Sequence, residues 1–277
     1  MGLRINTNIQ SLRAQSSMGQ VEAKKADSMA KLSSGSRINK AGDDAAGLAI
    51  SEKLKANIRG TQQATRNAGD GISMIQTAEG GLSETSNILI RLRELSVQAS
   101  SDTVGDTERK FADLEFQHLT QEVDRIATST EFNGKKLLTG EGDTMEFQIG
   151  VMNDAKNDRL AYRPQDSSGK ASDLGIEGLG VQTKASAQEN LEKIDNAING
   201  VNGNRANLGA LQNRLQSTIS NLETRNENLA AANSRIRDTD VASESAELAK
   251  SNILSAASTS VLAQANQSGS AALKLIG

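Results

Sequence analysis

The sequence has no cysteine and no tryptophan, and only one proline and one tyrosine among 277 residues. Without cysteine it can form no disulfide, thiolate metal site or cysteine nucleophile. Aromatic residues make up 2% of the chain, although large aromatic side chains usually dominate compact cores and small-molecule pockets. Their scarcity argues against a compact enzyme and favours helices packed through Ala, Leu, Ile and Val. The near absence of proline allows these helices to be long.

Charge and hydropathy exclude further classes. The net charge is −3, so the chain has no basic footprint for a nucleic acid. No apolar run approaches the roughly 18 residues that a membrane-spanning helix needs. The opening residues MGLRINTNIQSL lack the apolar core of a secretory signal peptide. We therefore expect a protein that stays inside the cell or leaves by a route that needs no cleaved signal.

Helical periodicity covers most of the chain. A weakly amphipathic first helix ends near Gly35, and a second starts after Gly42, where Asp43 or Asp44 can cap its N-terminus, and extends to about Ser100. The second helix has an apolar seam of Leu48, Ile58, Ala68, Ile72, Ile75, Leu82, Leu89 and Leu92. A third helix carries Ala112, Phe116, Leu119, Val123 and Ile126 at spacings of four and three.

The strongest pattern lies in the fourth helix, where an apolar residue recurs every seven positions. Its members are Ile194, Val201, Leu208, Leu215, Leu222, Leu229 and Ile236. This repeat is typical of a coiled-coil-like seam. After a break near RDTDVAS, a final helix is rich in Ala and Ser. The first and last helices bury little apolar area and would be marginal alone, so both need partners.

The region from about 141 to 185 is the only non-helical part. Two short strands, MEFQIG and DRLAYR, surround the loop VMNDAKN. Because the region is poor in apolar residues, we expect an exposed β-hairpin.

Sites for chemistry are few. The pair Asp43 and Asp44 could bind a divalent cation, but no further oxygen ligand lies at a recognisable spacing, so capping is the favoured role. GSRINKAG does not have the spacing of a phosphate-binding loop. His118 is the only histidine, with no second histidine or cysteine to share a metal, and we expect a helix-surface or packing role. The sequence therefore predicts no catalytic residue, metal or cofactor.

The segment RLRELSVQAS has a second face formed by Arg91, Leu95 and Gln98. Leu95 places an apolar residue where solvent is expected. A solvated face with one stray leucine is a common arrangement, but the small predicted core favours a packing face for a neighbouring subunit.

The residues resemble the bacterial flagellins over both ends and most of the chain. Ordered matches include LRINTNIQSL, LSSGSRINKAGDDAAGLAISEKL, DGISMIQTAEGGLSE, LIRLRELSVQAS, EFNGKKLL, LGALQNRLQSTISNLE, SRIRDTD and SVLAQANQ. The resemblance implies a mainly α fold, a long antiparallel coiled-coil-like bundle with a small β-hairpin region and a discontinuous terminal helical domain. Residues 1–42 and 237–277 would form an inner-tube domain and 43–236 an outer-tube domain, as in a minimal flagellin without outermost domains.

The resemblance also implies roles for particular residues. Subunit packing would involve Ile5, Ile9, Leu12, Leu254, Val261, Ala265, Ala272 and Ile276. The joint between the domains would contain Gly35, Arg37, Asn39, Gly42, Asp43 and Asp44. Contacts with an innate Toll-like receptor would involve Arg91, Leu95 and Glu115. Departures from the family pattern are the extra Gly2 and a tail that lacks the proline expected after ANQ.

We therefore expect a non-enzymatic, secreted subunit that polymerises into the helical flagellar filament for swimming. Its partners would be further copies of itself, an export chaperone, and the cap and hook-junction proteins, with no nucleic acid or membrane. The alternative within the superfamily is a hook–filament junction protein. A soluble receptor ligand or adhesin would need a larger variable region, and an enzyme-bearing flagellin would need an inserted domain.

Overall fold

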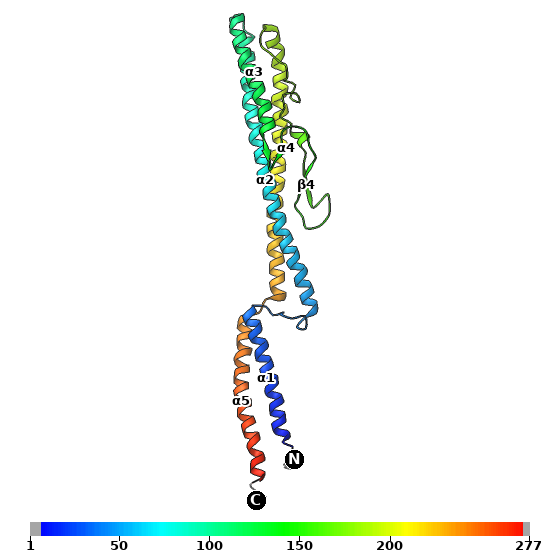
Figure 1. Cartoon of the computed structure of the whole chain (residues 1–277), viewed down its shortest axis with the longest axis vertical. Helices are drawn as coiled ribbons and strands as arrows, with labels where there is room; N and C mark the ends of the chain where they lie inside the picture. The colour runs from blue at the N-terminus through cyan, green and yellow to red at the C-terminus, as the bar shows by residue number, and fades with distance from the viewer. Residues whose placement is uncertain (1–6, 274–277) are drawn as a thin grey trace. The chain divides into compact units, whose positions relative to one another are not determined.

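The described part of the chain folds mainly as helix. The structure is a computed structural model that describes residues 7–273, with only the backbone described for residues 268–273. Its long helices are α1 (Ile9–Ser34), α2 (Ala45–Ala99), α3 (Asp106–Ser129), α4 (Lys184–Arg237) and α5 (Val241–Leu273) (Figure 1). Of the described residues, 73% are helical, so the expected mainly α fold is confirmed. Within the described part, no helix is long and apolar enough to cross a membrane.

Between residues 7 and 273, four short strands and one turn of 3-10 helix complete the fold. Strand β1 (Glu131–Phe132) pairs antiparallel with β2 (Lys135–Lys136), and β3 (Met145–Gln148) pairs antiparallel with β4 (Arg159–Tyr162). The 3-10 helix η1 (Pro164–Ser167) follows β4. The two strands expected around the loop VMNDAKN are therefore present, with Met145 opposite Tyr162 and Gln148 opposite Arg159.

The chain divides into two compact units. Unit 1 comprises Met1–Ala56 and Asn228–Gly277, and unit 2 comprises Asn57–Glu227. Helices α2 and α4 each contribute residues to both units. These limits lie 14 and 9 residues from the domain limits expected at 42 and 237. The reason is that unit 1 also includes the first turns of α2 and the last turns of α4. The assignment of domains to an inner and an outer tube stays a prediction.

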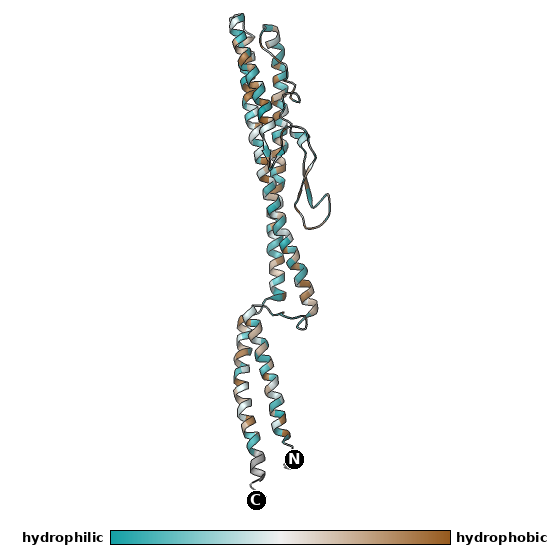
Figure 2. Ribbon diagram, viewed as in Figure 1, coloured by the Kyte–Doolittle hydropathy of each residue, from teal (hydrophilic) through white to brown (hydrophobic). Residues whose placement is uncertain are grey.

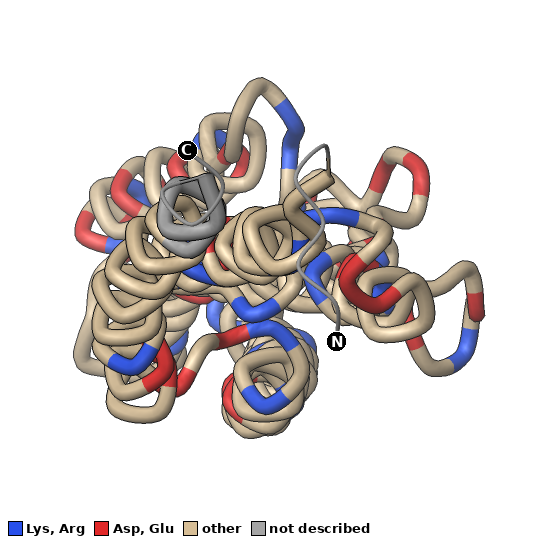
Figure 3. Tube along the Cα trace, turned by 90° about the horizontal axis from the view of Figure 1, so that it is seen from below, with Lys and Arg blue, Asp and Glu red and all other residues tan. Residues whose placement is uncertain are grey.

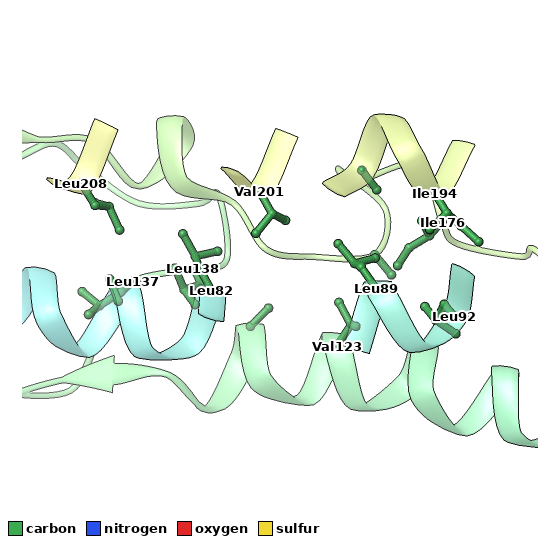
Figure 4. Packing of buried hydrophobic residues seen from close by; sticks show 14 of the residues in the cluster. Leu82, Leu89, Leu92, Val123, Leu137, Leu138, Ile176, Ile194, Val201 and Leu208 are labelled. Atoms are coloured by element: carbon green, nitrogen blue, oxygen red, sulfur yellow. The ribbon is translucent and has the colours of Figure 1, made fainter. Parts of the chain in front are cut away.

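Unit 2 contains a core of large aliphatic side chains. In Figure 4, leucine, isoleucine and valine side chains of α2, α3 and α4 point toward one another. The heptad residues of α4 from Ile194 to Leu222 are at most 5% exposed, which confirms the predicted seam over these turns. Burying one such side chain fully contributes about 1.5–3 kcal/mol. This seam and the facing residues of α2, including Leu82 and Leu89, therefore stabilise unit 2.

The expectation of an exposed hairpin over residues 141–185 is wrong. Leu160, Tyr162, Ile176 and Val181 all belong to the core of unit 2, and none is more than 5% exposed. Successive side chains on a strand point to opposite faces, so β4 turns Leu160 and Tyr162 inward while Ala161 stays exposed. A segment with few apolar residues is thus buried by the placement of those few.

Polar side chains of α3 hold this segment in place. Asp113 is 6% exposed, and its carboxylate accepts hydrogen bonds from the backbone N–H of Val181 at 2.7 Å and the amide of Gln182 at 2.8 Å. Asp124 accepts from the backbone N–H of Ala171 at 2.8 Å. Backbone groups that would otherwise be buried without partners are satisfied in this way. The loop leading into α4 is therefore attached to α3 by hydrogen bonds as well as by apolar contacts.

Candidate subunit-packing surface and domain joint

Helices α1 and α5, from opposite ends of the chain, form an antiparallel pair in unit 1. Near one end, the side chain of Asn8 caps α1 by accepting from the backbone N–H of Ser11, and it also donates to the carbonyl oxygen of Ala265 at 2.8 Å. The hydroxyl of Ser11 donates to the side chain of Asn266 at 2.7 Å. The pair is therefore linked by polar contacts close to both described ends of the chain.

The stripe along which the two helices cover each other is made mostly of small and polar residues. On α5 the buried or half-buried positions are Glu244, Glu247, Leu248, Ser251, Ser255, Ser258, Leu262 and Ala265. On α1 they are Ser11, Ala14, Met18, Val21, Lys25, Ser28, Lys31 and Leu32. Both sets follow the three- and four-residue spacing of one helix face. Small side chains bury little area, so the pair has only a thin apolar core.

Many of the larger apolar side chains of unit 1 lie outside this stripe. The exposed fractions are 47% for Ile9, 56% for Leu12, 54% for Met29, 62% for Val241, 70% for Ile253, 44% for Leu254 and 56% for Val261. We call these seven residues the outward-facing set. Figure 2 shows the hydrophobic segments distributed along both α1 and α5. Single exposed apolar residues are ordinary, but a helix pair that leaves seven larger apolar side chains outside its covered stripe indicates a surface that another chain covers.

Four of the residues predicted for subunit packing belong to this set, namely Ile9, Leu12, Leu254 and Val261. Ala265 differs, because it is 8% exposed and its covered face lies against α1 within the same chain. Ile5 and Ile276 lie outside the described residues, as does the side chain of Ala272. The packing role of all eight residues stays a prediction.

At the predicted joint, the segment that follows α1 lies beside the segment that follows α4. Gly35 ends α1 with a left-handed φ of +68°, which glycine adopts without strain. Beyond it, the backbone N–H of Arg37 donates to the carbonyl of Arg237 at 2.6 Å, and that of Thr239 donates to the carbonyl of Gly35 at 3.0 Å. The guanidinium of Arg37 donates to the carbonyl of Ile236 at 2.8 Å. The segment between α1 and α2 is thereby held against the segment between α4 and α5.

The two aspartates of the joint have different roles. Asp44 is the residue that caps α2, because its side chain accepts from the backbone N–H of Gly47 at 2.8 Å. Asp43 instead accepts from the backbone N–H groups of Lys40 at 2.9 Å and Asn39 at 3.0 Å. These two hydrogen bonds, from Lys40 first, lower the pKa of the Asp43 carboxyl below its ordinary value. Of the described side chains, no group of three or more His, Cys, Asp or Glu could hold a metal ion.

Two further joint residues show features that sequence reasoning assigned differently or missed. Gly42 has an ordinary φ and an open surrounding, so no conformational need for glycine is visible there. Ile38, which the sequence reasoning did not select, is only 2% exposed. Its side chain would lie 2.9 Å from a Cβ added at Gly47, so α2 approaches it closely through a glycine. The sequence did offer a signal for this burial, because Ile38 is an apolar residue between the polar residues Arg37 and Asn39.

The residues predicted for receptor contact lie on α2 and α3. Arg91 pairs with Glu94 and with Glu115, each at 2.9 Å, and these hydrogen bonds raise its pKa. Leu95 is 2% exposed and belongs to the core of the same chain, so the expectation that it presents a packing face to a neighbouring subunit is wrong. A helix packed against two others buries a wider arc than one seam. His118 is exposed, as expected for a helix-surface residue. Receptor contact itself stays a prediction.

Family comparisons agree with this arrangement of helices. The model of the bacterial flagellin N-terminal helical region matches residues 5–143, and that of the C-terminal helical region matches residues 191–276. A flagellin of Halalkalibacterium halodurans is 47% identical over 98% of this chain and 99% of its own length. The chain belongs to the flagellin family.

Two further relatives extend the comparison. The flagellar filament 33 kDa core protein of Treponema phagedenis is 40% identical over 98% of this chain and 99% of its own length. A crystal structure of Bacillus cereus flagellin, 32% identical, covers 61% of this chain and 94% of that chain with a TM-score of 0.50. Residues 144–190, between the two matched helical regions, contain β3, β4 and η1 and are short enough to be consistent with a flagellin that lacks a middle domain.

Proposed function

We propose that this chain is the repeating subunit of a bacterial flagellar filament and that copies of it polymerise through unit 1. The observation that carries the proposal is the outward-facing set on α1 and α5, which leaves larger apolar side chains uncovered in a single copy. The name of the T. phagedenis relative, a filament core protein, supports the same role. The role is structural and assigns no catalytic residue.

A single copy leaves apolar area on α1 and α5 exposed to water. Covering an exposed Leu or Val with another copy gains roughly 25 cal/mol per Å² of apolar area. Because the small residues between α1 and α5 supply little such area, neighbouring copies supply the remainder. When two different faces of identical copies bind each other, every copy adds to the next by the same rotation and translation. Unless that rotation closes a ring, the product is an open helical polymer. A stiff polymer of this kind transmits torque without any chemistry in the subunit.

Further roles follow from the resemblance and belong to the same proposal. Residues 1–42 and 237–277 would form the inner tube and residues 43–236 the outer tube, and the joint around Arg37 and Asp43 would connect them. The export chaperone would bind the apolar C-terminal helix α5 before assembly, and the cap and junction proteins would meet the ends of the polymer. Export would proceed without a cleaved signal peptide. The comparisons give no evidence for the alternative of a hook–filament junction protein.

The test is elongation of short filament seeds by purified monomer, followed by electron microscopy and by sedimentation of the polymer. We expect long uniform filaments from the unsubstituted protein. The double variant Leu254→Ser/Val261→Ser should raise the monomer concentration needed for growth at least tenfold, because two apolar contacts of roughly 1 kcal/mol or more each are lost.

The matched control is Leu254→Met/Val261→Ile, which keeps both side chains apolar and should elongate seeds normally. Both residues are exposed in the monomer, so neither variant should change its helical content. Normal elongation by the serine variant would contradict the packing role of α5. Failure of the unsubstituted protein to elongate seeds would contradict the filament role itself.

A further inference from the structure

A groove in unit 2 is lined by arginines from different parts of the chain. It lies between β4, η1 and α4 and has a volume of about 370 Å³. Arg159 comes from β4, Arg163 follows that strand directly, and Arg214 comes from α4, more than fifty residues later. Leu208 and Leu211 of α4 supply apolar lining beside them. The fold thus places three arginines around one groove, although no sequence motif connects them.

Two of these guanidinium groups have no partner. Arg159 donates to Glu146 at 3.2 Å and to the side chain of Asn153. Among the side chains that the structure describes, those of Arg163 and Arg214 make no hydrogen bond or ion pair. Asp166 is the one carboxylate in the lining, and it forms no ion pair with the three arginines within the same described part. The groove therefore has a local excess of positive charge.

The positive charge of the groove contrasts with the net charge of the chain. The chain is acidic overall, with a net charge of −3. Along the trace in Figure 3, basic and acidic segments are interspersed, and many surface arginines are paired, as Arg93 is with Asp195 and Arg125 with Glu122. A guanidinium group presents its N–H donors in a planar fork that matches carboxylate and phosphate oxygens. Asn207 in the same lining carries an amide that adds neutral donors.

We propose that this groove binds an oxyanion, a carboxylate or phosphate group, held by Arg163 and Arg214 with the side chain of Asn207 beside them. Arg163, Arg214 and Asn207 are exposed, so an anion can reach all three side chains from solvent. Two sources supply this chemistry. One is a free anion such as inorganic phosphate, and the other is a carboxylate of a neighbouring copy, a source that rests on the proposed filament function.

The first measurement is the broadening of the ³¹P resonance of inorganic phosphate by the unpolymerised protein, at constant ionic strength so that general screening does not change. We expect saturable broadening. The double variant Arg163→Gln/Arg214→Gln should bind phosphate at least about tenfold more weakly, because charge-assisted hydrogen bonds are lost. Circular dichroism of the helices reports whether the variant is folded, because Tyr162 itself lines the groove and would respond to the substitution directly.

The matched control is Arg225→Gln, an exposed arginine of the same helix that does not line the groove. It should leave phosphate binding unchanged. The proposal is overturned if the unsubstituted protein shows no saturable binding, or if the double variant and the control bind phosphate equally well.

Seed elongation then separates the two sources. Slower elongation by the double variant than by Arg225→Gln, with phosphate inhibiting the unsubstituted protein, identifies a neighbouring carboxylate as the ligand. Unchanged elongation, together with lost phosphate binding, identifies a free anion. Both readouts differ from a failure of the filament role, in which the unsubstituted protein does not elongate seeds at all.

Discussion

The two units differ in where their large apolar side chains lie: many are buried in unit 2, and many are exposed in unit 1. In unit 2, Leu89 of α2 is fully buried among residues of three helices. In unit 1, Leu254 of α5 is 44% exposed, while Ser28 and Ser251 are at most 3% exposed. The same residue type thus stabilises the single copy in unit 2 and is left available to another copy in unit 1. In the proposed filament, stability of the monomer and capacity for assembly would therefore reside in different parts of one chain.

The sharpest test of this comparison is one substitution in each unit. Leu89→Ala should lower the free energy of unfolding of unit 2 by about 2–5 kcal/mol, because it leaves a cavity in a packed core. Leu254→Ala should change monomer stability by no more than about 0.5 kcal/mol. Denaturant unfolding followed by Tyr162 fluorescence reports unit 2, and circular dichroism reports all helices. Equal losses from the two substitutions would contradict the division between the units.

A smaller loss of stability is expected when a buried hydrogen-bond acceptor of unit 2 is removed. Asp113→Ala should destabilise unit 2 by about 1–3 kcal/mol, because the backbone N–H of Val181 and the amide of Gln182 lose their acceptor in a buried place. The control is Asp70→Ala, which removes an exposed carboxylate from the middle of α2 and should leave stability unchanged or slightly raised. Equal stability of both variants would show that the loop into α4 is held by apolar contacts alone.

The smallest effect concerns the joint in unit 1 and depends on pH. Folding lowers the pKa of Asp43, so its hydrogen bonds are fully present above the ordinary value of 3.8 and are lost as the pH falls through the lower folded value. Hydrogen-exchange protection of the Asn39 and Lys40 amides should fall in that acidic range. In Asp43→Asn both amides should be less protected than in the unsubstituted protein already at neutral pH, because the acceptor carries no charge.

The amide of Gly47 gives an internal control for this measurement, because it bonds to Asp44 rather than Asp43. Its protection at neutral pH should be unaffected by Asp43→Asn. If the amides of Asn39 and Lys40 keep full protection in the variant, the Asp43 carboxylate does not hold the joint.

Periodic patterns predicted the helices well because burial on one face repeats along the chain. The seven-residue repeat from Ile194 to Leu222 and the seam containing Leu82 and Leu89 are both buried as expected. The same reasoning failed at Leu95, since the width of a buried arc depends on how many helices pack against it.

Contacts between distant segments were beyond the reach of a local pattern. Asp113 bonds to residues near Val181, and the Tyr162 hydroxyl donates to the carbonyl of Leu137 at 2.7 Å. No spacing in the sequence connects these positions. The three arginines of the groove were missed for the same reason, since Arg214 meets the other two only after α4 has packed beside the β-hairpin. The capping aspartate of α2 was limited to two candidates, and geometry selected Asp44.

The hydrogen bond between Asn8 and Ala265 also sets an order in time. Its partners are separated by 257 positions in the chain, so a ribosome must complete nearly the whole protein before α1 can meet α5. Unit 2, whose segments are all synthesised earlier, can form its core while the last helix is still missing. The paired surface of unit 1 can therefore form only at the end of synthesis.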